Sequence, residues 1–269
     1  MPDPAAYASV LTDLASEHAA LDAVVGLLRA EAWSIPTPAE GWDVRDQVWH
    51  LTFFDTQAVL AVDDPGAFTA SVGDLLADIE GWEQAVVAEG RAVEPGDLQA
   101  RWRAGRAAML EHFAALDPGA RIPWYGPPMS ATSFATARLM ETWAHGQDVV
   151  DGLRSAGRAA ERPATDRLRH IAHLGVRTLG FSYAVRGREA PDGEVRVELV
   201  APQGGTWAWG PEDAVDVVRG PAIDFCLVVT QRRNLVDATL EVEGPLATEW
   251  LAIAQCFAGG PGPGRPPAG

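Results

Sequence analysis

The spacing of apolar residues divides the chain into a helical first part and a mixed second part. In the first part, apolar residues recur every three or four positions, as they do on the buried face of an amphipathic helix. Prolines, glycines and acidic turn residues separate these stretches. The expected helices cover residues 7–28, 43–62, 69–89 and 97–116, and a further helix begins at Ser130 or Thr132. We interpret residues 1–155 as a four-helix bundle.

The pattern changes after a polar linker at residues 154–163. A helix is expected over residues 165–185, and the period-two alternation of residues 194–200 predicts a strand with one wet face. Further strands are expected at 206–209, 214–218 and 238–244, and helices at 221–230 and 245–257. We therefore predict a smaller α+β domain over residues 156–260 and, from its Gly and Pro content, a flexible tail over residues 261–269. The fold class is α+β.

Composition narrows the range of partners. The chain has 269 residues, 47% of them hydrophobic, which is enough for one large or two ordinary domains. Its formal net charge of −16 argues against nucleic acid or an anionic membrane as a partner. Cys226 and Cys256 are far apart and form no Cys-x-x-Cys motif, and no signal peptide is evident. We expect a reduced cytoplasmic protein that binds a small molecule and could form a homodimer.

Glu141 and His145 are the first candidates for chemistry. Positions four apart lie on one face of a helix, so this carboxylate and imidazole could bind one metal ion. Their neighbours on that face are mostly small or apolar, and burial of an unpaired charge is costly. The alternative is a simple Glu–His hydrogen bond, so a third ligand elsewhere must decide. The aromatic loop at residues 124–129 leads into this helix and could cover a site there.

A second candidate region is the segment at residues 41–51, Gly-Trp-Asp-Val-Arg-Asp-Gln-Val-Trp-His-Leu. Asp43 is a plausible N-cap, and Asp46 three residues later imitates a capping box. His50 follows Asp46 by four positions, so the Asp46 carboxylate could accept a hydrogen bond from the imidazole and orient it. Taken alone, His50 would more often be a core histidine than a metal ligand.

Together, the two segments resemble the DinB-like superfamily and, more closely, the mycothiol-dependent maleylpyruvate isomerase group. The resemblance implies an N-terminal metal-binding bundle and a smaller C-terminal α+β domain. It also implies a metal held by His50, Glu141 and His145. The absence of Lys and the abundance of Ala, Gly and Arg fit an actinobacterial host.

The same resemblance suggests a role for an arginine in the second domain. In the family, a C-terminal helix ends in an arginine that faces the site, and here Arg232 and Arg233 occupy that place. Either guanidinium could bind a substrate carboxylate. The alternative is an exposed helix end, where arginine complements the helix dipole.

The implied ligand set suits a catalytic ion, because two histidines and one carboxylate leave coordination positions open. Zn²⁺ is the default, and Fe²⁺ or another divalent ion also fits. The resemblance implies mycothiol as a cosubstrate, and hence a thiol-dependent transferase or isomerase that acts on a small carboxylate-bearing or electrophilic metabolite. Two alternatives stay open: a metal-dependent hydrolase of amides or esters with Asp46 or Asp148 as base, and a non-enzymatic metal- or ligand-binding protein.

Overall fold

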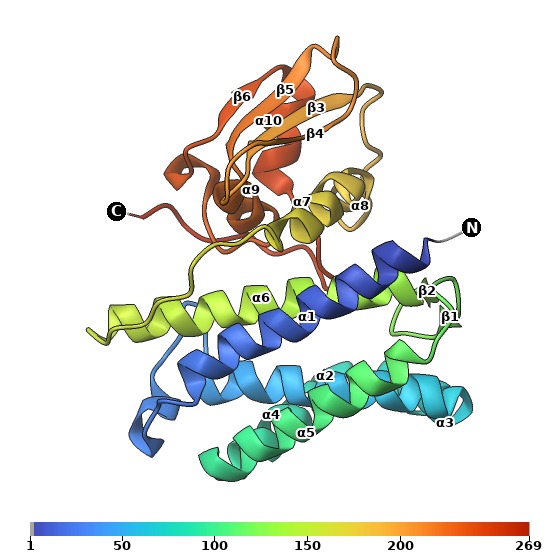
Figure 1. The fold of residues 1–269 in the computed structure, drawn as a ribbon, viewed down its shortest axis with the longest axis vertical. Helices are drawn as coiled ribbons and strands as arrows, with labels where there is room; N and C mark the ends of the chain where they lie inside the picture. Colours follow the sequence, from blue (N-terminus) through green and yellow to red (C-terminus); the bar gives the residue numbers. More distant parts are fainter. Residues whose placement is uncertain (1–2, 269) are drawn as a thin grey trace. The chain divides into compact units, whose positions relative to one another are not determined.

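The chain separates into two units between Arg162 and Pro163, in a computed structural model that describes residues 3–268 (Figure 1). We had expected the boundary slightly earlier, after residue 155. The residues in between belong to the first unit because Arg162 anchors them there. Its guanidinium donates to Glu17 Oε1 at 3.0 Å and to the Trp143 carbonyl at 2.6 Å.

The first unit is helical and contains the expected bundle. Helices α1, α2, α5 and α6 pack on one another, α2 against α5 and α6, and α1 against α6 and α5. Figure 1 shows α1 lying along α6. The elements are α1 (Pro4–Val25), η1 (Ala30–Ser34), α2 (Val44–Asp63), α3 (Pro65–Ala77), α4 (Ile79–Arg91), α5 (Pro95–Ala114), β1 (Arg121–Ile122), β2 (Met129–Ser130) and α6 (Ala131–Ser155). Helices α3 and α4 contact α2.

The single helix expected over residues 69–89 is wrong: α3 and α4 are separate helices that meet at Asp78. The backbone of Asp78 is extended (φ −153°), and its carboxylate accepts a hydrogen bond from the Gly81 N–H at 3.0 Å. Asp78 therefore acts as the N-cap of α4. The apolar periodicity continues across this break, so the pattern alone did not reveal it.

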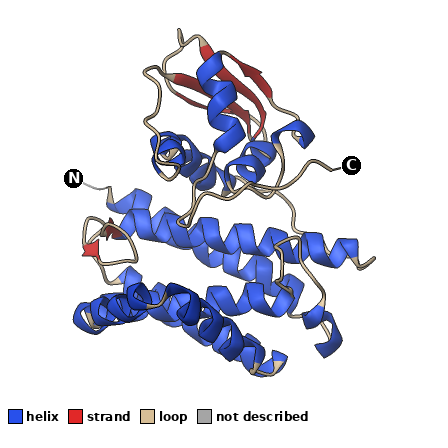
Figure 2. Cartoon of the chain, turned by 180° about the vertical axis from the view of Figure 1, so that it is seen from behind, coloured by secondary structure: helices blue, strands red, loops and turns tan. Residues whose placement is uncertain are grey.

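The second unit is the predicted α+β domain, with a sheet packed against helices (Figure 2). The strand order is β4-β3-β5-β6, with β3 and β5 parallel and the other pairs antiparallel. Its elements are α7 (Leu168–Arg177), α8 (Leu179–Ala184), β3 (Val195–Val200), β4 (Thr206–Trp209), β5 (Asp216–Pro221), α9 (Ala222–Val229), η2 (Leu235–Asp237), β6 (Glu241–Glu243) and α10 (Pro245–Ile253). Helix α9 packs on β3, β5 and α7, whereas α10 packs on β5, β6 and α8.

One sequence expectation for the second unit is wrong. The helix expected over residues 165–185 is divided at Thr178, whose hydroxyl donates to the carbonyls of Leu174 and Gly175. The flexibility expected for the tail stays a prediction, and over its described part the tail makes hydrogen bonds with the second unit. Asn234 donates to the carbonyl of Arg265 at 2.8 Å, and the Ala268 N–H donates to Asp237 Oδ2 at 2.8 Å. Composition alone does not show such acceptors and donors elsewhere in the chain.

A buried ion pair joins α2 to α6 inside the bundle. The Arg138 guanidinium donates to Asp55 Oδ1 through Nε at 3.1 Å and Nη2 at 2.8 Å, and both side chains are almost fully buried. Nη2 also reaches the Leu51 carbonyl at 3.4 Å. Because a charge in this position has no access to water, each partner depends on the other.

Among residues 3–268, no helix is long and apolar enough to cross a membrane.

We predict that Asp55→Ala lowers the free energy of unfolding by about 3–5 kcal/mol, because it leaves Arg138 buried without its counter-ion. Urea titration followed by circular dichroism measures this. The matched control is Asp63→Ala, which removes a largely exposed contact with His112 and should cost no more than about 1 kcal/mol. Equal losses in the two variants would show that the Asp55–Arg138 pair contributes no more than a surface pair.

A second prediction concerns His18 on α1, which is 2% exposed and, among the described residues, has no hydrogen-bond partner at either ring nitrogen. Burial, with the nearby Arg106 and Arg138, lowers the pKa of His18 from 6.5 to about 3. Between these values the unfolded chain binds the proton and the folded chain does not, so stability should fall as the pH drops from 6.5 toward 3. The slope approaches about 1.4 kcal/mol per pH unit.

The comparison variant is His18→Leu, which cannot take up this proton. Its unfolding free energy, measured by urea titration at pH 7, 5.5 and 4, should fall less steeply with decreasing pH than that of the wild type. Parallel pH dependences in the two proteins would show that His18 does not contribute.

Candidate metal centre

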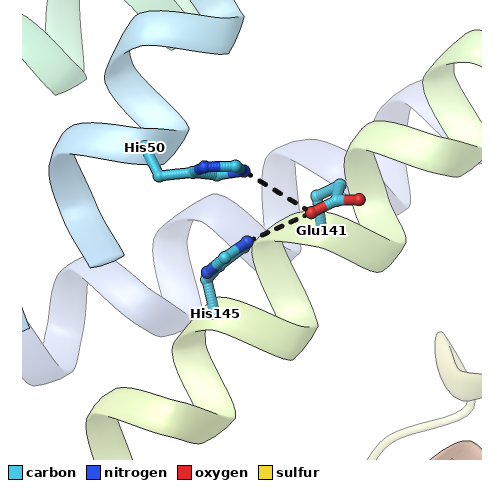
Figure 3. A group of neighbouring side chains, drawn as sticks. All are labelled: His50, Glu141 and His145. Atoms are coloured by element: carbon cyan, nitrogen blue, oxygen red, sulfur yellow. Dashed lines mark hydrogen bonds and ion pairs between the residues drawn. The ribbon is translucent and has the colours of Figure 1, made fainter. Parts of the chain in front are cut away.

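His50, Glu141 and His145 converge between α2 and α6 (Figure 3). One ligand atom from each residue lies within 4.8 Å of the other two. Glu141 Oε2 is 3.1 Å from His145 Nε2 and 3.8 Å from His50 Nε2. Figure 3 shows both imidazoles directed at the same carboxylate. The fold thus brings together all three residues that the sequence suggested as metal ligands.

Side-chain caps determine where α2 and α6 begin, as expected. Asp43 Oδ1 accepts from the Asp46 N–H at 3.0 Å, and Asp46 Oδ2 accepts from the Asp43 N–H at 3.1 Å, so α2 begins with a capping box. Ser130 caps α6 by accepting from the Ser133 N–H. The regular turns of α6 then place Glu141 and His145 on one face.

Asp46, however, does not orient His50 as the sequence suggested. Both of its carboxylate oxygens accept hydrogen bonds from Arg91, at 3.0 Å and 2.7 Å. No hydrogen bond joins Asp46 to His50 within the described part of the chain. Asp46 instead ties the start of α2 to the last residue of α4. Spacing along one helix could not reveal this competing partner, because Arg91 arrives from another helix.

Gln47 is the polar neighbour of the site that the sequence analysis missed. Its Oε1 lies 2.6 Å from His145 Nδ1, and its Nε2 donates to Thr37 Oγ1 at 2.9 Å. The Thr37 hydroxyl donates its single proton to the Trp42 carbonyl at 2.9 Å. Thr37 Oγ1 can therefore only accept from Gln47, which turns the Gln47 carbonyl oxygen toward His145. A glutamine on the buried face of α2, one turn before His50, was the available signal.

This chain of hydrogen bonds fixes which nitrogen of His145 carries a proton. Nδ1 must donate to Gln47, so Nε2 points toward Glu141 with a lone pair unless the ring takes up a second proton. A lone pair and a carboxylate at 3.1 Å repel each other unless a cation lies between them. A divalent metal ion would satisfy His145 and Glu141 and bind His50 as well, so the residues fit a metal ion.

The charge states also suit a cation. Burial and the neighbouring His145 lower the pKa of His50 to about 3, so its imidazole is neutral and has a free lone pair at neutral pH. Burial alone would raise the pKa of Glu141, but the neighbouring imidazoles of His145 and His50 hold that pKa well below its ordinary value. The site therefore offers imidazole nitrogen and carboxylate oxygen, a donor set used by zinc and iron.

The three side chains are not closed off from solvent. His50 is 24% exposed, Glu141 22% and His145 10%. A fully enclosed structural ion would need four protein ligands, whereas three partly accessible ligands leave room for an external one. This arrangement resembles catalytic rather than structural metal sites.

Aromatic rings flank the two histidines. The Trp42 ring stacks on His145, with centroids 6.0 Å apart and planes 19° apart, and lies 5.5 Å from His50. The centroid of the Phe54 ring lies 4.6 Å from that of the His50 ring. The site is therefore bordered by apolar surfaces next to its polar ligands.

The loop expected to cover the site reaches one of these rings. Trp124 and Tyr125 contact Phe54, with ring centroids 6.0 Å and 5.6 Å away. Trp124 also packs on Phe134 of α6 at 4.5 Å. The loop thus contacts a ring that borders His50, and its covering of the site stays a prediction.

Arg232 and Arg233 lie in the second unit, just beyond α9. Both backbone N–H groups donate to the Leu227 carbonyl, at 2.7 Å and 3.1 Å, and so close the end of that helix. The Arg232 side chain donates to the Thr230 carbonyl and lies 5.8 Å from the Phe257 ring. Arg233 lines a cavity of about 260 Å³ formed by residues of the second unit. A role for either arginine in binding substrate stays a prediction.

The helical bundle and its His–Glu–His cluster are typical of the DinB-like class of proteins. Within that class, the chain belongs to the mycothiol maleylpyruvate isomerase N-terminal domain family, whose family model matches residues 14–150. Two uncharacterised proteins of Mycobacterium tuberculosis, from strains CDC 1551 / Oshkosh and H37Rv, are each 45% identical to it over 265 residues. These matches cover 98% of this chain and the whole of each relative.

Solved structures share the fold. The crystal structure of the mycothiol-dependent maleylpyruvate isomerase matches with a TM-score of 0.57 and 15% identity, covering 92% of this chain and 96% of that one. A histidine-to-alanine mutant of that enzyme matches with the same TM-score and coverage, at 14% identity. At this identity the likeness shows a common fold over the matched 92% of the chain.

We predict that Gln47→Leu weakens metal binding by roughly ten- to a hundredfold, because His145 loses the partner that orients it. Gln47→Glu keeps the acceptor and should bind metal better than Gln47→Leu. Competition with a chromophoric chelator measures the affinities. The control is Gln84→Leu, which removes a hydrogen bond to Glu80 on exposed helix surface. An unchanged affinity in folded Gln47→Leu would show that Gln47 does not orient the ligand.

Proposed function

We propose that this chain is a divalent-metal-dependent enzyme that uses a small thiol of the mycothiol type to isomerise or transfer a group. Its substrate would be a small carboxylate-bearing or electrophilic metabolite, and Zn²⁺ is the favoured ion. The observation that carries the proposal is the convergence of His50, Glu141 and His145, with the His145 proton directed to Nδ1 by Gln47. Family membership supports the use of a thiol cosubstrate, since the family is named after a mycothiol maleylpyruvate isomerase.

The residues of the site have distinct roles in this proposal. His50, Glu141 and His145 would hold the ion, and Gln47 keeps the coordinating lone pair of His145 directed into the site. A divalent ion bound there would lower the pKa of a thiol or a water molecule that it coordinates. The single carboxylate of Glu141 offsets only part of a divalent charge, so an anionic ligand remains favoured at the open positions.

The thiol must come from outside the chain. Cys226 is 0% exposed and Cys256 4% exposed, and both lie in the second unit. Burial raises the pKa of Cys226 well above its ordinary value, so this thiol is a poor nucleophile. A cosubstrate thiol is therefore needed for sulfur chemistry at the metal centre.

The hydrolase alternative has less support because it lacks a suitable general base. Asp46 is engaged by Arg91 through both oxygens. Asp148 is 1% exposed and has interactions of its own within the protein. A purely structural metal would in turn be expected to have a complete ligand set, whereas these three ligands are partly exposed.

The first test is metal content, measured by elemental mass spectrometry on protein purified without chelator. We expect close to one equivalent of a divalent metal in the wild type and a loss of most of it in His145→Ala, which removes a ligand. His112→Ala, on α5 and paired with Asp63, is the control and should retain the metal. No metal in the wild type, together with no binding of added Zn²⁺ at micromolar concentration, would overturn the proposal.

Activity then separates the two enzymatic classes. The metal-loaded protein should consume an electrophile, such as a maleate analogue or an activated aryl halide, only when a thiol is added. Turnover of a model ester without thiol would favour the hydrolase instead.

A further inference from the structure

We propose that the molecule transformed at this centre carries a planar aromatic or conjugated group, held against Trp42 and Phe54 beside His50. This inference rests on the proposed function and concerns the substrate class of the same site. It follows from what surrounds the three ligands within the first unit.

The rings lie where a group next to the metal would have to lie. Trp42 and Phe54 both contact His50, with centroid distances of 5.5 Å and 4.6 Å, and Trp42 also stacks on His145. Both rings are only half-buried. Of the three ligands, His50 and Glu141 are also half-buried, whereas His145 is buried. Aromatic surface therefore adjoins the partly exposed side of the site, where it can stack on a planar ligand.

A second layer of rings supports the first. Tyr125 contacts Phe54 at 5.6 Å and Trp82 at 6.1 Å, and Trp82 contacts Phe53 at 5.4 Å. Burial raises the pKa of Tyr125 to about 12, so its phenol stays neutral. Tyr125, Trp82 and Phe53 are all half-buried. A closed hydrophobic core would bury these rings more completely, whereas a binding surface leaves their faces accessible.

Three arginines on α2, α4 and α6 are bonded to other groups in the described part of the first unit. Arg138 is the arginine whose charge influences His50, but it is 4% exposed and its guanidinium is bonded to Asp55. Arg91 is paired with Asp46, and Arg45 donates to the Arg91 carbonyl. Within the described residues of this unit, the surroundings of the ligands thus favour a planar apolar group over a second carboxylate.

The test uses thiols as anchored probes, because the sulfur binds the metal and the remainder reports on the neighbouring surface. Cobalt-loaded full-length protein is titrated with benzyl mercaptan and with cyclohexylmethanethiol, and the thiolate-to-cobalt absorption band gives each dissociation constant. Both probes have a six-membered ring of similar size, but only the first is planar and aromatic. We expect benzyl mercaptan to bind about tenfold more tightly, as stacking on two rings would give.

Variants assign the preference to the two rings. In Phe54→Leu and Trp42→Leu the ratio of the two dissociation constants should fall toward one, while the affinity for 2-mercaptoethanol stays within about twofold and shows that the metal centre is intact. Trp207→Leu, which alters a half-buried tryptophan on β4 of the second unit, should keep the wild-type ratio.

The outcomes separate the two proposals. If no thiol produces the cobalt band, thiol binding at the metal is absent, and the proposed function falls together with this inference. If all thiols bind but benzyl mercaptan has no advantage, or if the advantage survives in both ring variants, only the inference about the substrate class is overturned.

Discussion

The packing of α2 against α6 is the constraint on which the candidate site depends, because His50 lies on one helix and Glu141 and His145 on the other. Buried polar contacts between α2 and α6 fix this interface, among them the Gln47–His145 hydrogen bond and the Asp55–Arg138 ion pair. Since Gln47 precedes His50 by one turn and Asp55 follows it by little more than one, the triad lies between them. A relative shift of the helices would leave polar groups buried without partners, which costs several kcal/mol.

The parts of the site that depend on local geometry could be predicted from the sequence. The spacing of Glu141 and His145 within a helix determines that they share a face, and the Asp43–Asp46 capping box formed as expected. His50 was different, because nothing local distinguishes a ligand from a core histidine, and only the resemblance to a known family linked it to the other two. The bundle and the α+β unit likewise followed from the period of the apolar residues.

The failures have one physical origin: they depend on partners that are distant in sequence or on caps that the apolar pattern ignores. Asp46 has the right spacing to reach His50, yet Arg91 from α4 engages its carboxylate. Gln47 gains its meaning only because Thr37 and Trp42 determine the direction of its amide. The break at Asp78 depends on one extended residue whose side chain caps the next helix, while the apolar stripe continues on both sides.

The fold shared with the maleylpyruvate isomerase leaves the choice of substrate to the surroundings of the site. At 15% identity, the chain and the maleylpyruvate isomerase share an architecture, and an architecture by itself does not determine a substrate. Within the first unit the basic side chains near His50 are occupied, by Asp55 for Arg138 and by Asp46 for Arg91. The half-buried rings of Trp42 and Phe54 lie against His50 instead. The Asp55–Arg138 ion pair that holds the ligand helices in register therefore also engages the arginine whose charge influences His50.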